Sequence, residues 1–348
     1  MLELYMPIGH LSNLMDRPEL FDQTIDLIEK SMGYDKHESF KIDFFPLMEK
    51  NNSEHDFILV ENSKVLGHVG VKLRDLGNLN LKMKVALIGG VAVLEEYRGK
   101  GILKRILTEV FTRFDLDVGI YILWSDLVTL YNKFGFYLAG AAVESTGTQN
   151  KIFYNKYIKT KLNNITKDDL NQIKNIYREF CSKDYLSFLR TDEDWESLKK
   201  IESVDLFILK DDKEKILGYF CQNKGMDLRG IVHEFGYLKE NQNEIHELFN
   251  SLKTWFPSVS SESFPGKNIY QGFLKMGSLE IFNKFLWERS HGIFQILNWR
   301  ESEVETIFKN KKFILPKESF FSCIFGPYPP KQLENISCQL FLSGLDSI

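Results

Sequence analysis

The stretch VALIGGVAVLEEYRGKGILKRILT, residues 85–108, predicts a β-strand, a short loop and the start of an amphipathic helix. The helix is indicated by apolar residues at three- and four-residue spacing, which is the pattern of one buried face: Ile102, Leu103, Ile106, Leu107, Val110, Phe111 and Phe114. The loop carries Gly99 and Gly101, so its backbone N–H groups can turn toward one concavity, and a helix start adds the positive end of its dipole. This arrangement predicts a diphosphate site, with cations supplied by Arg98, Lys100 and Lys104.

The loop differs from the two best-known phosphate-binding loops, because it has neither G-x-G-x-x-G nor G-x-x-x-x-G-K-[ST] spacing. It resembles the acetyl-CoA loop of the GCN5-related N-acetyltransferases (GNAT), whose pattern is [QR]-x-x-G-x-[GA]. Arg98 and Gly101 match this pattern, whereas Leu103 stands where Gly or Ala is usual. That departure is similar to the loop of the enhanced-intracellular-survival type of acetyltransferase. The resemblance implies that acetyl-CoA is bound by Arg98, Gly99, Lys100, Gly101, Ile102 and Leu103.

A second motif, LYNKFGF at residues 130–136, follows a predicted strand at 119–124. It is similar to the L-Y-x-x-x-G-F motif of the same superfamily. The resemblance implies that Tyr131 is the general acid that protonates the departing thiolate of coenzyme A; the alternative is an ordinary core aromatic. Ser125 and Asp126 end the preceding strand, where acceptor sites are often lined, so both are candidate substrate contacts, with a helix N-cap as the other reading of Asp126.

The predicted strand before the cofactor loop contains the pair Gly89-Gly90. Glycine inside a strand often marks a bulge or a close backbone approach, although a packing role is equally open. In the GNAT family this strand separates from its neighbour here. The resemblance implies that the backbone of Val91, Ala92 and Val93 binds the pantetheine arm and polarises the thioester carbonyl.

The order of elements predicts an α/β (α+β) fold with two GNAT-like domains, each a mixed, mostly antiparallel sheet flanked by helices. The first, residues 1–158, is expected to be catalytic. Its predicted elements are a possible edge strand at 1–8, helices at 17–32 (N-cap Asp16, stop Gly33) and 39–50 (interrupted by Pro46), and strands at 56–61, 65–74 and 79–94.

The second domain, residues 159–348, repeats this order at lower fidelity. Its predicted elements are helices at 165–180 and 240–255, and strands at 205–209, 216–222 and 231–237. Where a phosphate loop should stand, residues 238–243 read LKENQN, with no glycine and an acidic residue. We therefore expect a degenerate copy without a cofactor.

The chain ends in the apolar segment LFLSGLDSI, residues 340–348, which we expect to be tucked into the fold. In the enhanced-intracellular-survival type the terminal carboxylate acts as the base, so Ile348 is a candidate for that role, while simple closure of the second domain is the alternative. Other candidate bases are Glu54, His55, His68 and Asp126. For His68 a structural role is the stronger reading.

The 348-residue chain is 43% hydrophobic and 26% charged, with a net charge of −4, which indicates a globular protein. The acidic balance argues against a nucleic-acid partner. The four cysteines lack C-x-x-C spacing and no apolar run reaches about 18 residues, so we expect reduced thiols, no metal, no membrane segment and a cytoplasmic location. An oligomer is possible.

These observations predict an acetyl-CoA-dependent N-acetyltransferase, in which a small-molecule, peptide or protein amine attacks the thioester directly. One alternative is a non-catalytic acyl-CoA-binding or sensor module. Another is a tRNA-dependent aminoacyl transferase, which the acidic balance and the intact loop of the first half argue against.

Overall fold

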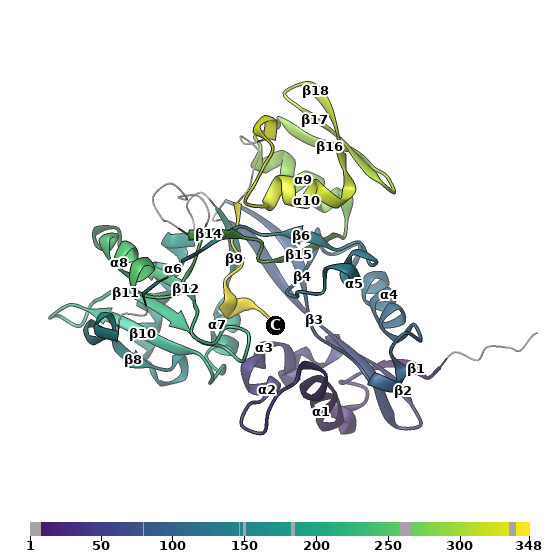
Figure 1. The fold of residues 1–348 in the computed structure, drawn as a ribbon, viewed down its shortest axis with the longest axis horizontal. Helices are drawn as coiled ribbons and strands as arrows, with labels where there is room; N and C mark the ends of the chain where they lie inside the picture. Colours follow the sequence, from purple (N-terminus) through teal and green to yellow (C-terminus); the bar gives the residue numbers. More distant parts are fainter. Residues whose placement is uncertain are drawn as a thin grey trace, which may run out of the picture.

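The computed structural model describes residues 8–78, 80–145, 147–148, 151–181, 185–257, 266–333 and 339–348. Nine of the described strands form one sheet, in the order β1-β2-β3-β4-β5-β15-β6, with β9 beside β3 and β19 beside β9. These strands are β1 His10–Asn13, β2 Asp56–Glu61, β3 Lys64–Asn78, β4 Leu81–Val93, β5 Ile120–Leu123, β6 Tyr137–Ala139, β9 Tyr185–Leu189, β15 Gly272–Met276 and β19 Gln339–Leu340. The mixed, mostly antiparallel α/β architecture expected from the sequence is confirmed (Figure 1).

The long β3–β4 pair forms the middle of this sheet. β2 and β3 are joined by a turn in which Asn62 and Ser63 have positive φ angles of 48° and 59°, as a tight hairpin requires. β3 then pairs antiparallel with β4 from Asn78↔Leu81 to Gly67↔Val93. The predicted strand at 79–94 is therefore confirmed, apart from Leu79, which lies outside the described residues.

Helices cover both faces of the large sheet. α4 (Ile102–Phe114) packs on one face, where its buried residues share a hydrophobic cluster with β2, β3, β4 and β5. α1 (Phe21–Met32) packs on the opposite face together with α9 (Leu279–Arg289) and α10 (Lys317–Phe325). The predicted helix face of α4 is confirmed, and Gly33 ends α1 in a left-handed conformation with a φ of 76°.

Three expected element boundaries are wrong. Asp16 does not cap α1, because residues 18–20 first form a 3₁₀ turn that begins with Pro18, and Leu20 stands at the N-cap. The predicted helix at 39–50 is two short helices, α2 (Phe40–Asp43) and α3 (Phe45–Met48), broken before Pro46. The predicted helix at 240–255 is α8 (Asn243–Ser251), and Trp255 belongs to β13 (Trp255–Pro257). The expected edge strand at 1–8 lies outside the described residues, except for Ile8.

The second unit is built on a four-stranded sheet in the order β12-β11-β10-β8. Its elements are β8 Ile158–Thr160, α6 Lys167–Cys181, α7 Asp192–Leu198, β10 Asp205–Lys210, β11 Ile216–Gln222, β12 Val232–Tyr237 and α8. The N-terminus of α6 is capped by Thr166, whose hydroxyl accepts a hydrogen bond from the Asp169 N–H (3.0 Å). A three-stranded sheet of β7 (Ala142–Ser145), β13 and β14 (Gly266–Ile269) joins residues from both halves of the sequence.

The two halves of the chain are interleaved. β15 lies between β5 and β6 in the large sheet, although about 150 residues separate it in sequence from β5, and its Phe273 and Leu274 are fully buried there. β9 extends the same sheet at the far end of β3. The proposed division between residues 158 and 159 is therefore crossed by the large sheet, which contains strands from both sides of it.

A third unit, which the sequence patterns did not predict, stands apart at the top of Figure 1. It consists of α9, α10 and a three-stranded antiparallel sheet of β16 (Phe294–Trp299), β17 (Glu303–Phe308) and β18 (Lys311–Pro316). Its interior is aromatic and belongs to the hydrophobic cluster on the face of the large sheet that α1 covers. The aromatic residues include Phe282, Phe320, Phe321 and Phe325.

Candidate active site

The edge of β4 opens at the point where the glycine pair lies. β4 pairs in parallel with β5 from Val85↔Ile120 to Ile88↔Leu123, and this pairing ends at Ile88. On the other side, the register with β3 shifts between His68 and Gly70, and Gly90 takes a φ of 57°. Of the roles that the sequence left open for the glycine pair, a bulge is therefore the one found at Gly90. The consequence is that Val91–Val93 have no partner on β5, so an extended ligand could add hydrogen bonds to this edge of the strand.

The Arg98–Leu103 loop follows directly from this edge. Gly99 and Gly101 have φ angles of 77° and 81°, and a Cβ atom placed on either would meet no atom within 4 Å. Open space above two left-handed glycines leaves the loop backbone accessible, and Gly101 is the N-cap of α4. The free N–H groups at the start of this helix suit a phosphate group, so the residues fit the diphosphate of a coenzyme A molecule.

Cations surround the loop. Arg98 is exposed and its Nε donates to the Val93 carbonyl (3.3 Å), while the Lys100 ammonium lies 4.7 Å from the centre of the Tyr97 ring. Lys104 is exposed on the first turn of α4. The loop thus combines backbone donors, a helix N-terminus and positive charge, which are the three properties that the sequence led us to expect.

Tyr131 lies on α5 (Val128–Asn132), in the hydrophobic cluster that also contains Ile88 and Leu123 at the point where β4 and β5 separate. Its ring packs against Phe136 (centroids 6.1 Å apart) and against Phe273 of the interleaved strand β15 (6.0 Å). Burial, with a further contribution from Asp126, raises the pKa of Tyr131 to about 12. The hydroxyl therefore keeps its proton at neutral pH, as a proton donor must.

Ser125 and Asp126 lie at the carboxyl end of β5. The Ser125 hydroxyl accepts a hydrogen bond from the Leu127 N–H (3.1 Å), and Leu127 is the N-cap of α5. The reading of Asp126 as the cap of this helix is therefore wrong. Its carboxylate is exposed and free to face an acceptor.

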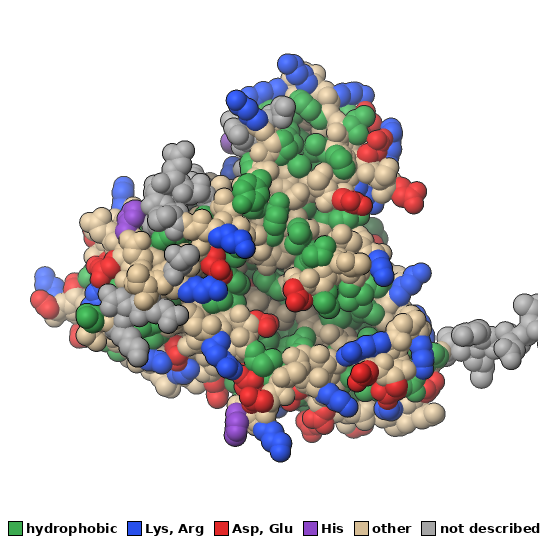
Figure 2. Space-filling view, viewed as in Figure 1, with side chains coloured by type: hydrophobic (Ala, Val, Ile, Leu, Met, Phe, Trp, Pro, Cys, Tyr) green, Lys and Arg blue, Asp and Glu red, His purple; other side chains and the backbone are tan. Residues whose placement is uncertain are grey.

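Further acidic side chains border the same region. Partial desolvation and the nearby Asp126 carboxylate raise the pKa of Asp227. The pKa of Tyr34 is raised by burial and by the carboxylates of Asp43, Asp227 and Glu38. Asp126 thus acts on Asp227, and Asp227 and the buried Asp43 both act on Tyr34, although the three carboxylates come from separate segments. Figure 2 shows a recess in the middle of this face, with acidic side chains at its border.

The end of the chain reaches β4. Residues 340–348 are buried, as expected, and Figure 1 shows them, in yellow, passing between the second unit and the long β3–β4 pair. A Cβ atom placed on Gly89 would lie 2.5 Å from the carboxyl carbon of Ile348. The terminal carboxyl group thus packs on Gly89, the first residue of β4 beyond its pairing with β5. A side chain at this position would prevent the approach, so glycine is required.

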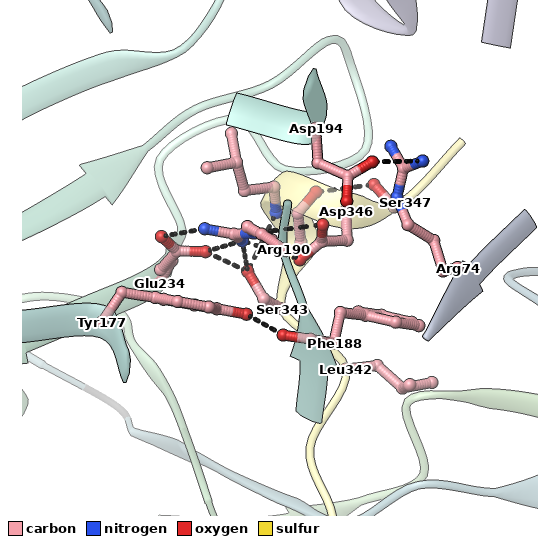
Figure 3. Close-up of polar contacts among 12 residues, drawn as sticks. Arg74, Tyr177, Phe188, Arg190, Asp194, Glu234, Leu342, Ser343, Asp346 and Ser347 are labelled. Carbon is pink, nitrogen blue, oxygen red and sulfur yellow. Dashed lines mark hydrogen bonds and ion pairs between the residues drawn. The ribbon is translucent and has the colours of Figure 1, made fainter. Parts of the chain in front are cut away.

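A buried ionic network anchors the tail (Figure 3). Arg190 follows β9, and its guanidinium binds the carboxylates of Glu234 on β12 and Asp346 in the tail, the latter at 2.6 Å. The rings of Tyr177 and Trp195 lie 4.0 Å and 4.6 Å from the same guanidinium. Desolvation lowers the pKa of Arg190, but the two carboxylates more than offset it and the pKa is raised. The pairing satisfies charges that would be costly to bury alone.

The other candidate bases lie in different surroundings. His68 is fully buried, with Nδ1 2.7 Å from the Gly90 carbonyl and Nε2 3.4 Å from Asp56 Oδ1, so it supports the bulge. Glu54 forms an ion pair with Arg113 (2.6 Å), and burial lowers the pKa of His55. Of the other candidates, the Ile348 carboxyl group lies against Gly89 of β4, and Asp126 is exposed just beyond the end of β5.

Sequence reasoning did not find Lys224, Arg190 or Phe273, which shape this region from the second half of the chain. No spacing signal marks them, because each reaches the site through long-range contacts. Among the described residues, no cluster of side chains could hold a metal ion, and no helix is long and apolar enough to cross a membrane.

Comparison with known proteins agrees with this geometry. Residues 17–139 match the family model of the acetyltransferase (GNAT) domain. No curated protein matches the chain. Among solved structures, Eis1 from Mycobacterium abscessus is similar, with a TM-score of 0.61 and 12% identity, over 98% of this chain and 99% of that one.

Two further solved structures are similar. A GCN5-related N-acetyltransferase from Anabaena variabilis has a TM-score of 0.60 and 13% identity, over 94% of this chain and 93% of that one. The N-myristoyltransferase of Saccharomyces cerevisiae with bound myristoyl-CoA has a TM-score of 0.51 and 13% identity, over 78% of this chain and 83% of that one. At these identities the likeness shows the fold, and the resemblance to the GNAT superfamily is confirmed.

Proposed function

We propose that the chain, whose residues 17–139 match the GNAT acetyltransferase model, is an acetyl-CoA-dependent N-acetyltransferase with one cofactor site. The observation that carries this proposal is the continuity of the open β4 edge, Val91–Val93, with the Arg98–Leu103 loop at the N-terminus of α4. A strand edge followed by an anion-binding loop suits a ligand with an extended amide-containing arm and a diphosphate, which is the chemistry of coenzyme A.

Bound acetyl-CoA would supply an acetyl group activated as a thioester. The backbone N–H groups of Val91–Val93 would donate hydrogen bonds to the thioester carbonyl as negative charge develops on it. Tyr131 would donate its phenolic proton to the departing sulfur. The Ile348 carboxylate would accept the proton that the attacking amine loses as its nitrogen bonds to the acetyl carbon. The Ile348 carboxylate would thus gain the proton that the amine loses, and Tyr131 would lose the proton that the sulfur gains, so the net charge would not change.

The acceptor is an amine, and the acidic recess favours one that carries further positive charge. Asp126 and Asp227 interact with each other, and Asp43 and Asp227 both act on Tyr34. A second cation of an acceptor placed among these carboxylates would gain favourable electrostatic energy and would orient the reacting amine. Small molecules, peptides and protein lysines remain acceptor classes that satisfy this description.

The test is release of free coenzyme A from acetyl-CoA in the presence of a panel of amines. We expect turnover with diamines or lysine-containing peptides and a higher KM for monoamines of the same length. Acetyl-CoA binding without turnover on any amine would support the non-catalytic module instead.

A further inference from the structure

Lys224 is a buried lysine that no part of the chemistry above uses. It follows β11 in the second unit and is fully buried. Its Nζ donates to the main-chain carbonyls of Gly344 (3.0 Å), Leu345 (3.0 Å) and Ser347 (2.5 Å), and lies 3.1 Å from the Ser347 hydroxyl. A lysine ammonium has three donors, so the tail carbonyls alone can satisfy it.

The surroundings of Lys224 contain both signs of charge. The pKa of Lys224 is lowered to about 7, chiefly by desolvation. Asp346, Asp43 and Glu234 raise this pKa, whereas Arg190 lowers it further. The Nζ atom also lies 5.0 Å from the centre of the Phe44 ring. A buried ammonium is expensive, and its partners here are almost all on the last residues of the chain.

The contacts of Lys224 end one residue before the terminal carboxyl group. Ser347, whose carbonyl it binds, is followed by Ile348, and the carboxyl carbon of Ile348 packs on Gly89 of β4. Arg190 holds Asp346 from the other side. The tail is thus held by two basic side chains from the second half of the chain, while its end lies on β4.

We propose that Lys224 is a positioning residue that fixes the C-terminal carboxylate against the open edge of β4, so that the cofactor-free second unit takes part in the reaction by holding the base. This inference rests on the proposed role of Ile348. It explains why a unit without a phosphate-binding loop carries buried cations aimed at the tail.

The experiment compares Lys224→Met, removal of Ile348 and the double variant by kcat, KM and acetyl-CoA affinity. Methionine keeps the apolar stem and deletes the ammonium. Because a displacement of about 1 Å can cost about 10²-fold in rate, we expect kcat to fall by about that factor with unchanged acetyl-CoA affinity. Removal of Ile348 moves the carboxylate by about 3.5 Å and should cost at least as much. The double variant should be no slower than the variant that lacks Ile348.

A second readout is independent of turnover. In Lys224→Met, carboxypeptidase should release Ile348 faster than from the wild type, and the amides of residues 345–347 should exchange faster. Lys275→Met is the matched control, since Lys275 is another largely buried lysine that donates to a backbone carbonyl, that of Met276, away from the tail. It should leave both the rate and tail digestion unchanged.

The outcomes separate the two proposals. If removal of Ile348 lowers kcat but Lys224→Met stays within twofold of wild type, the positioning role is wrong and the proposed base stands. If the two losses multiply in the double variant, Lys224 acts apart from the carboxylate and the inference is also wrong. If removal of Ile348 has no effect, the proposed base is wrong and the inference fails with it. Should Lys224→Met fail to fold, Lys224→Gln, which retains an amide donor, is measured in its place under the same criteria.

Discussion

At the scale of single residues, the two glycines of the proposed cofactor loop matter because of what a side chain would do there. Gly99 and Gly101 combine positive φ angles with free space, so substitution would strain the backbone and also fill the volume where phosphates are expected. Ile102, which follows them, is fully packed, so it anchors the loop from below.

We expect Gly101→Glu to abolish acetyl-CoA binding, because its carboxylate would enter the phosphate site at the start of α4. Repulsion of a few kcal/mol corresponds to a loss of affinity of roughly 10²-fold or more, measurable by calorimetry. Gly33→Glu is the matched control, because Gly33 has a similar φ of 76° and equally free space at the end of α1, outside the site. Equal affinities for Gly101→Glu and wild type would remove the loop from the cofactor site.

Tyr131→Phe should lower kcat by roughly 10²-fold and leave acetyl-CoA affinity unchanged, because it removes only the proton donor. The ring contacts with Phe136 and Phe273 remain in the variant, so folding should be preserved. Tyr137→Phe, on the neighbouring strand β6, serves as the control. A kcat within twofold of wild type would leave Tyr131 as a core aromatic, the alternative that the sequence left open.

At the scale of elements, the account depends on how the tail meets β4. Gly89 has an ordinary extended conformation, so alanine there adds no backbone strain, yet its Cβ would lie 2.5 Å from the carboxyl carbon of Ile348. We expect Gly89→Ala to displace the tail and to reduce kcat by about 10- to 10²-fold.

Gly277→Ala controls for a general disturbance of the sheet. A Cβ atom on Gly277 would lie 2.4 Å from the Val118 carbonyl, so its clash with backbone is comparable and lies away from the tail. If Gly89→Ala and Gly277→Ala change kcat and thermal stability equally, the approach of Ile348 to β4 has no special role in the reaction.

The burial of Lys224 also predicts a pH dependence of stability. Its pKa is about 7 in the folded protein and near the ordinary 10.5 when unfolded. Below pH 7 both states carry the proton and the cost of burying the charge is complete. Between pH 7 and 10.5 the unfolded chain binds the additional proton, so stability rises with pH, by at most about 1.4 kcal/mol per unit.

Thermal denaturation of wild type and Lys224→Met between pH 6 and 9.5 tests this expectation. The melting temperature of wild type relative to the variant should be constant below pH 7 and should rise above it. A constant difference over the whole range would mean that Lys224 keeps its proton in the folded protein throughout.

At the scale of the whole molecule, local patterns predicted the elements that stand next to each other in sequence. The strand, loop and helix around residues 85–114 and the hairpin at Asn62-Ser63 were predictable because turn chemistry and hydrophobic periodicity are local. The buried tail was also predicted from sequence, and a bulge was one of the readings that Gly89-Gly90 left open.

Features that depend on long-range packing were not predictable in this way. Gly272–Met276 reads as a short apolar strand, and nothing in it indicates insertion between β5 and β6. Lys224 and Arg190 look like ordinary surface cations in the sequence, and only the fold buries them against the tail. The unit containing β16–β18 was missed because its strands and aromatic helices follow no motif.

The interleaving has a mechanistic consequence for the whole chain. Tyr131 packs on Phe273, and the tail that reaches Gly89 is held by Lys224 and Arg190, so residues of the second half contact both Tyr131 and β4. Residues 238–243, where a second phosphate loop would stand, form an extended residue, a 3₁₀ turn and the start of α8, with no glycine.

Calorimetric titration of the full chain with acetyl-CoA tests the central claim most directly, because affinity and stoichiometry are read together. We predict one site per chain, formed by the β4 edge and the Arg98–Leu103 loop. Two sites per chain would show that the second unit also binds the cofactor, and no binding would contradict the proposed function.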